Sequence, residues 1–163
     1  MNFKWNDEMI SAFKKVMYND EQFYNISCQF GFPENRAVKE GFESLAKIII
    51  GQQISTVVAK KICDKLIVDN VLNEKILSKI SIEKLKLYGL SHQKSYYLKN
   101  LALLISNKDI DLTSLNHLPS KEVMNLLIKI KGIGKWTINN YKIFALQDID
   151  AWPSADLALQ EAV

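Results

Sequence analysis

The 163-residue sequence lacks any apolar run close to the roughly 18 residues that a membrane-spanning helix needs. Its longest apolar stretches, residues 45–51 and 101–105, are long enough only for a buried element. A secretory signal peptide is not predicted either, because Lys4, Asp7 and Glu8 interrupt the hydrophobicity of the N-terminal segment. We therefore expect a soluble, cytoplasmic protein without a membrane partner.

Cysteine and histidine are also scarce. The two cysteines, Cys28 and Cys63, form no C-x-x-C pair, and His92 and His117 lie far from both in sequence. This pattern argues against a zinc site and predicts two reduced, buried thiols. An iron–sulfur cluster needs four cysteine ligands, which these residues do not supply. We expect no metal and no cofactor, with a monovalent cation at the hairpin described below left open.

The sequence has only three prolines and six glycines, and it contains no internal repeat, low-complexity tract or Gly/Pro/Ser-rich linker. With 48% hydrophobic and 24% charged residues it has the composition of one ordinary globular domain, which excludes a disordered or collagen-like chain. The formal net charge of +3 permits an anionic partner but does not require one.

Apolar residues recur at helical spacing through most of the chain, which predicts an all-α fold of about eight or nine short helices. Ser81, Ser91 and the Pro119–Ser120 pair are expected to begin helices, and Gly89 is expected to follow one. The β-branched run at residues 47–50 continues a helical register, so we predict a helix there as well. Three sets carry the pattern: Phe42, Leu45, Ala46 and Ile49; Tyr97, Leu101, Leu104 and Ile105; Val123, Leu126, Leu127 and Ile130.

The segment at residues 126–137 (LLIKIKGIGKWT) is an amphipathic helix, a Gly-x-Gly turn and the start of a second helix that runs to about Leu146. Gly132 and Gly134 are able to adopt positive φ, while Ile133 is expected to anchor the turn in the core. The first backbone N–H groups of the second helix then favour a phosphate oxygen. Lysines at positions 129, 131 and 135 add positive charge. A helix-hairpin-helix is predicted over residues 123–146; a plain glycine-terminated helix joined to another is the alternative.

Four blocks carry a wider resemblance: residues 42–56 (FESLAKIIIGQQIST), 88–102 (YGLSHQKSYYLKNLA), 130–137 (IKGIGKWT) and 152–160 (WPSADLALQ). In this order they resemble the helix-hairpin-helix DNA glycosylase superfamily, and within it the alkylpurine (3-methyladenine) DNA glycosylase II branch. The resemblance implies a compact multi-helix all-α domain over residues 41–163, with residues 1–40 as an N-terminal helical extension packed on it. It also implies a base excision repair enzyme that hydrolyses the N-glycosidic bond of alkylated purines in double-stranded DNA.

The resemblance implies a catalytic aspartate about twenty residues beyond the hairpin, and Asp156 lies twenty positions after Trp136. A separate physical argument supports this assignment. Pro153 and Ser154 are expected to start a final helix with Ser154 as its N-cap, so Asp156 would lie in the first turn, where the helix dipole favours an ionised carboxylate. The alternative is an acidic residue that only stabilises a helix start.

Members of the superfamily that also cut the DNA strand carry a lysine two residues after the second hairpin glycine, where this sequence has Trp136. Lys135 lies about 100° away around the helix and is expected to face phosphate. The resemblance therefore implies a monofunctional enzyme that forms no Schiff base and flips the base out of the duplex. The resemblance also places Trp136, Tyr141 and Trp152 in the base pocket. It makes Gln53 the wedge that fills the gap left in the duplex by the flipped base, unless Gln52 and Gln53 are only polar helix caps. The residues that it assigns to DNA-backbone binding are Lys131, Gly132, Ile133, Gly134, Lys135 and Thr137.

The end of the chain departs from the family pattern, because related glycosylases continue for several helices beyond the aspartate. We expect a fold truncated after the catalytic aspartate, monomeric unless a partner covers the surface left exposed. Two other functions stay open. One is a helix-hairpin-helix module that binds DNA without chemistry, and the other is a glycosylase of the same superfamily with another lesion specificity.

Overall fold

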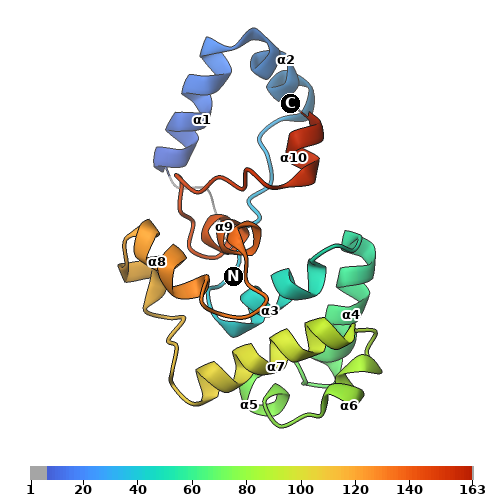
Figure 1. The fold of residues 1–163 in the computed structure, drawn as a ribbon. Helices are drawn as coiled ribbons and strands as arrows, with labels where there is room; N and C mark the ends of the chain where they lie inside the picture. Colours follow the sequence, from blue (N-terminus) through green and yellow to red (C-terminus); the bar gives the residue numbers. More distant parts are fainter. Residues whose placement is uncertain (1–6, 163) are drawn as a thin grey trace. The chain divides into compact units, whose positions relative to one another are not determined.

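The computed structural model describes residues 7–162 and contains, within that range, α-helices and one short 3-10 helix but no strand. Figure 1 shows these helices joined by loops, and they confirm the predicted all-α class. None of them is both long and apolar enough to cross a membrane. The helices are α1 (Asp7–Asn19), α2 (Glu21–Phe30), α3 (Phe42–Gly51), α4 (Thr56–Val68), α5 (Glu74–Leu77), α6 (Ile82–Lys86), α7 (His92–Ser106), η1 (Leu115–His117), α8 (Ser120–Leu127), α9 (Lys135–Phe144) and α10 (Leu157–Ala162).

The chain divides into two compact units, Met1–Val38 and Lys39–Val163. In the first unit the Asp20 side chain caps α2 by accepting a hydrogen bond from the backbone N–H of Phe23 at 2.8 Å. The ring of Phe13 packs against the rings of Phe23 and Phe32, with centroid separations of 5.3 and 4.2 Å. The described part of the predicted extension therefore contains the helices α1 and α2, followed by a non-helical segment at residues 31–40. Residues 1–6 lie outside the described range, and the packing of the extension on the second unit stays a prediction.

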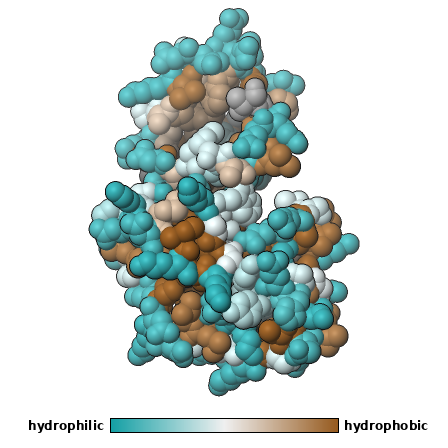
Figure 2. All heavy atoms as spheres, in the orientation of Figure 1, coloured by the Kyte–Doolittle hydropathy of each residue, from teal (hydrophilic) through white to brown (hydrophobic). Residues whose placement is uncertain are grey.

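The second unit has a core built around α3 and α7. Helix α3 packs against α4, α7 and α9, while α7 also packs against α5 and α6. Figure 2 shows that hydrophilic residues cover most of the face in view and that hydrophobic residues gather in separate patches. The buried side chains of α3 are Phe42, Leu45, Ala46, Ile49 and Ile50. Full burial of one leucine or isoleucine side chain contributes about 1.5–3 kcal/mol, so α3 is a major source of stability.

Helix boundaries follow the predicted caps. The hydroxyls of Ser81 and Ser91 accept hydrogen bonds from the third backbone N–H after each serine, which begins α6 and α7. Gly89 follows α6 with a φ of +96°, a conformation that favours glycine. The β-branched residues at 47–50 lie in α3, as the helical register predicts.

The partly exposed carboxylate of Asp148 links the two helices of the hairpin to the segment that follows them. Oδ2 of Asp148 accepts a hydrogen bond from the Ser120 hydroxyl at 2.7 Å and forms an ion pair with Nζ of Lys142 at 3.1 Å. Its Oδ1 accepts from the backbone N–H of Asp150 at 3.0 Å. Burial alone raises the pKa of Asp148, but these hydrogen bonds and the charge of Lys142 bring it below its ordinary value. The carboxylate is thus ionised and fixes the path of the chain toward Asp156.

Replacing Asp148 with asparagine leaves the Lys142 ammonium buried without its partner, because Lys142 is only 6% exposed. We expect the free energy of unfolding at neutral pH to fall by about 3 kcal/mol in urea titrations. Since the pKa of Asp148 is lowered in the folded state, its contribution is present above the unfolded pKa of about 3.9 and is lost as pH falls through the folded pKa. The difference in the free energy of unfolding between the wild type and Asp148→Asn therefore becomes smaller in acid.

The matched control is Asp64→Asn on the exposed Lys60–Asp64 pair, whose atoms lie 2.8 Å apart. Because both side chains are solvated, this change is expected to cost less than about 1 kcal/mol. Equal losses for the two variants would contradict the role given to Asp148.

Candidate active site

The hairpin turn joins α8 to α9 through Gly132, Ile133 and Gly134. Ile133 is 4% exposed and its N–H donates to the Ile130 carbonyl at 3.1 Å, so it anchors the turn in the core as predicted. Gly132 has the expected positive φ of +87°, but Gly134, at φ −101° and ψ 178°, is extended. The prediction for Gly134 is corrected for a physical reason: it is the N-cap residue of α9, and an N-cap takes extended backbone. Helix α8 also ends earlier than predicted, at Leu127.

Gly132 is required at its position for a second reason besides φ. A Cβ atom added there would overlap the ring of Tyr97, which packs against the turn. The turn is also held by Gln52, the C-cap residue of α3, whose Nε2 donates to the Gly132 carbonyl and to Oγ1 of Thr137, each at 2.9 Å. The end of α3 and the hairpin therefore form one hydrogen-bonded unit.

The N-terminus of α9 presents hydrogen-bond donors to solvent. The backbone N–H groups of Lys135, Trp136 and Thr137 have no acceptor within residues 7–162, and Gly134 adds no side chain over them. The Lys135 side chain is exposed, as is that of Lys131, whose Nζ lies 5.8 Å from the ring centroid of Tyr96. Thr137 is buried with its hydroxyl bonded to Gln52, so it is able to offer only its N–H. The arrangement suits a phosphate oxygen.

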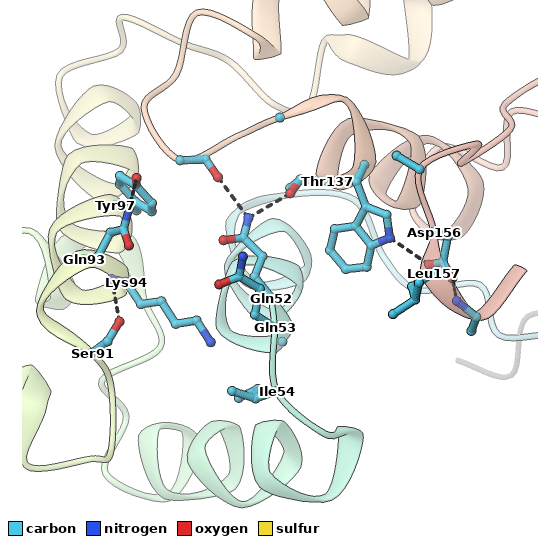
Figure 3. A pocket seen from close by; sticks show the side chains of 16 residues that line it. Gln52, Gln53, Ile54, Ser91, Gln93, Lys94, Tyr97, Thr137, Asp156 and Leu157 are labelled. Carbon is cyan, nitrogen blue, oxygen red and sulfur yellow. Dashed lines mark hydrogen bonds between the residues drawn. The ribbon is translucent and has the colours of Figure 1, made fainter. Parts of the chain in front are cut away.

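Next to the hairpin lies a pocket of about 710 Å³. Figure 3 shows Gln93, Lys94 and Tyr97 of α7 on one side of Gln52 and Gln53, and Asp156 and Leu157 on the other. The pocket lining contains two charged side chains, Lys94 and Asp156. Trp136, the first-turn residue of α9, also lines it.

Asp156 is bound on both carboxylate oxygens. Its Oδ2 accepts a hydrogen bond from Nε1 of Trp136 at 2.7 Å, and its Oδ1 accepts from the backbone N–H groups of Ala158 and Leu159 at 3.1 and 3.3 Å. The pKa of Asp156 is lowered chiefly by the Trp136 indole and further by the two backbone donors, against the effect of burial. Asp156 is therefore an ionised carboxylate at neutral pH, and the indole ring beside it faces the pocket.

These contacts correct the predicted start of the last helix. Ser154 is not its N-cap: residues 154 and 155 form a turn in which the N–H of Asp156 donates to the Pro153 carbonyl at 2.8 Å. The carbonyl of Asp156 accepts from Gln160 N–H at 3.0 Å, so Asp156 itself is the N-cap residue of α10 and does not lie in its first turn. Because residues 154 and 155 form this turn, α10 begins only at Leu157.

Gln53 lies in the loop between α3 and α4, exposed at the pocket, with a φ of +56°. A left-handed conformation costs a non-glycine residue about 1–2 kcal/mol and persists only where its surroundings hold it. Gln52, the residue before it, is bonded to the hairpin, and Nζ of Lys94 donates to the carbonyl of Ile50 in the last turn of α3 at 2.7 Å. The chain that enters the loop is thus held at two points.

Two residues predicted for the base pocket are placed elsewhere. Tyr141 is 0% exposed and its hydroxyl accepts a hydrogen bond from the N–H of Gly41 at 2.8 Å, so it is a core residue. Burial raises the pKa of Tyr141 to about 12. Trp152 is 64% exposed and does not line the pocket, while its carbonyl accepts from Nδ2 of Asn139 at 2.8 Å. Of the three predicted aromatic residues, the pocket contains Trp136.

The chain resembles known proteins in sequence and in fold. A structure of 3-methyladenine DNA glycosylase from Archaeoglobus fulgidus is 30% identical, covers 96% of this chain and 56% of its own, and superposes with a TM-score of 0.76. A structure of Schizosaccharomyces pombe 3-methyladenine DNA glycosylase (Mag1) in complex with abasic DNA is 27% identical over 91% of this chain and 76% of its own, with a TM-score of 0.80. No protein-family model matches the chain.

Curated proteins match in the same way. Alkylbase DNA glycosidase-like protein mag2 of Schizosaccharomyces pombe is 30% identical over 125 residues, which is 73% of this chain and 59% of that protein. The chain spans between 30% and 59% of the length of the curated relatives it matches. These likenesses confirm the resemblance predicted from the four sequence blocks.

Replacing Gly132 with alanine is expected to lower both stability and DNA affinity. The added methyl group overlaps Tyr97 and the backbone keeps an unfavourable positive φ, so we expect a loss of about 2–4 kcal/mol in urea titrations. We also expect displacement of the turn to weaken any binding of undamaged duplex DNA through the free donors of α9, measured by fluorescence anisotropy. Gly134→Ala is the matched control, because its φ is −101° and no atom lies within 4 Å of the added Cβ. Its cost is expected to stay below about 1 kcal/mol, and equal destabilisation of the two variants would refute the steric argument.

Proposed function

We propose that this chain, which is related to the 3-methyladenine DNA glycosylases of the helix-hairpin-helix superfamily, hydrolyses the N-glycosidic bond of alkylated purines in double-stranded DNA. The observation that carries the proposal is the ionised carboxylate of Asp156, held 2.7 Å from the Trp136 indole nitrogen in a pocket beside a phosphate-binding hairpin. One site thus combines donors for the DNA backbone, an aromatic ring and a carboxylate.

The proposed reaction begins when the damaged nucleotide rotates out of the duplex into the pocket. The bond between C1′ and the purine nitrogen breaks, and its electron pair leaves with the base, so positive charge develops on the sugar. Asp156 stabilises this oxocarbenium charge and accepts a proton from the attacking water, whose oxygen forms the new bond to C1′. An N-alkylated purine such as 3-methyladenine is cationic while bound and leaves neutral, so one carboxylate is sufficient without a separate acid.

Trp136 is proposed to hold the flipped base. Its ring lines the pocket, and its N–H is bonded to Asp156, which fixes the plane of the indole. A cationic purine on such an aromatic face gains about 0.5–2 kcal/mol. Because Trp136 occupies the position two residues after Gly134, where strand-cutting relatives have a nucleophilic lysine, we propose a monofunctional enzyme that leaves an abasic site.

The backbone grip and the wedge complete the proposal. Lys131, Lys135 and the amides around Gly134 are proposed to bind phosphate oxygens without reading sequence. Gln53, exposed on its braced loop, is proposed to enter the duplex where the flipped base was. We expect the protein to act as a monomer and to need no metal ion.

The test is release of free base from methylated double-stranded DNA, measured by chromatography. Asp156→Asn keeps the size of the side chain but removes its charge, so we expect release of 3-methyladenine to fall at least about a hundredfold while DNA affinity is unchanged. Asp64→Asn on the exposed face of α4 serves as the matched control and should release base like the wild type. Persistent release by Asp156→Asn would remove Asp156 from the mechanism, whereas DNA binding without release by the wild-type chain would favour a non-catalytic binding module.

A further inference from the structure

Lys94 is the charged pocket residue that the proposed mechanism does not use. It extends from the first turns of α7 into the pocket toward Gln53, as Figure 3 shows. Its Nζ donates to the Ile50 carbonyl at 2.7 Å, and no carboxylate within residues 7–162 pairs with it. The ammonium of Lys94 thus has a backbone carbonyl as its partner in place of a carboxylate.

The carbonyl that Lys94 binds belongs to the last turn of α3. Such carbonyls lack helical N–H partners and carry the negative end of the helix dipole, so a lysine ammonium stabilises them. Burial lowers the pKa of Lys94, and the interaction with this carbonyl favours the charged form. Lys94 therefore holds the last turn of α3 by one of its free carbonyls.

The last turn of α3 leads directly into Gln53. Gln52 caps α3 and is bonded to the hairpin, and Gln53 follows at once in the left-handed region. With the Ile50 carbonyl released, the last turn of α3 loses its hydrogen bond from the Lys94 side chain, and only the apolar packing of α3 on α7 remains on that side to oppose the strain at Gln53. If Gln53 leaves the left-handed conformation, its side chain no longer points in the same direction from the loop.

We propose that Lys94 is a positioning residue for base extrusion: by holding the last turn of α3 it keeps Gln53 ready to enter the duplex. This inference rests on the proposed function, since it concerns the step that delivers the damaged base to Asp156. Extruding a stacked and paired base costs free energy, and a base without a partner costs less. The contribution of Lys94 should therefore depend on whether the damaged base starts paired.

The same helix supplies a matched control. Lys99, five residues along α7, donates its Nζ to the Ile80 carbonyl at 2.7 Å, which is the same bond at the same distance. Like Lys94 it is half-buried, but it does not line the pocket. Removing either lysine deprives one carbonyl of its donor, and only the change at Lys94 alters the support of Gln53.

The experiment compares Lys94→Met, Lys94→Arg and Lys99→Met on two duplexes in single-turnover base release. One duplex carries 7-methylguanine paired with cytosine, and the other carries it as a single unpaired bulge. We expect Lys94→Met to slow release about tenfold from the paired site and less than about twofold from the bulge. Lys94→Arg, which keeps a cationic donor, should restore the paired rate, and Lys99→Met should leave the ratio of the two rates unchanged.

A second readout does not depend on chemistry. With 2-aminopurine in place of the damaged base, wild-type protein and Lys99→Met should raise the fluorescence of the paired probe on binding, and Lys94→Met should not. Equal slowing on both duplexes, or an unaltered fluorescence rise with Lys94→Met, would show that Lys94 serves folding alone and would overturn the inference. If wild-type protein extrudes the probe but releases no base from either duplex, the proposed function fails while the role of Lys94 in extrusion stands.

Discussion

The hydrogen bond from the Trp136 indole to Asp156 is the contact on which the site depends. It joins the first turn of the hairpin's second helix to the start of α10 across twenty residues of sequence, and it is the largest reason for the lowered pKa of the carboxylate. Because the same tryptophan follows the turn that presents free backbone donors, the position of the carboxylate is coupled directly to the donors that are proposed to bind phosphate. A displacement of the first turn of α9 would therefore also move the Asp156 carboxylate.

A second set of contacts brings the loop that carries Gln53 to the same place. Gln52 binds the hairpin turn through two hydrogen bonds, and Lys94 binds the end of α3 from the other side. The strain of the left-handed Gln53 is thereby maintained by polar contacts from α7 and from the hairpin. In this way α3, the most buried helix of the second unit, supports function at its exposed end and stability along its length.

Local patterns in the sequence predict much of the fold, and they predict less of the site. The helical register identifies α3 despite its β-branched residues, and the Gly-x-Gly turn with its buried Ile133 follows from local chemistry alone. The burial of Tyr141 depends on Gly41, one hundred residues away, and no periodicity reports such a contact. The placement of Lys94 against the Ile50 carbonyl is likewise a product of tertiary packing. It follows only once the start of α7 is known to lie against the end of α3. The sequence pattern does not predict the capping role of Asp156, because a turn at residues 154–155 precedes the helix.

The most direct test of the coupling between hairpin and carboxylate is the pKa of Asp156, measured by NMR titration of its side-chain carboxyl carbon in the wild type and in Trp136→Phe. Phenylalanine keeps an aromatic ring but removes the N–H that donates to Oδ2. This coupling predicts a pKa of Asp156 below the ordinary value of about 3.9 in the wild type and a rise toward that value in the variant. A wild-type pKa at or above the ordinary value, or one that the substitution leaves unchanged, would contradict it.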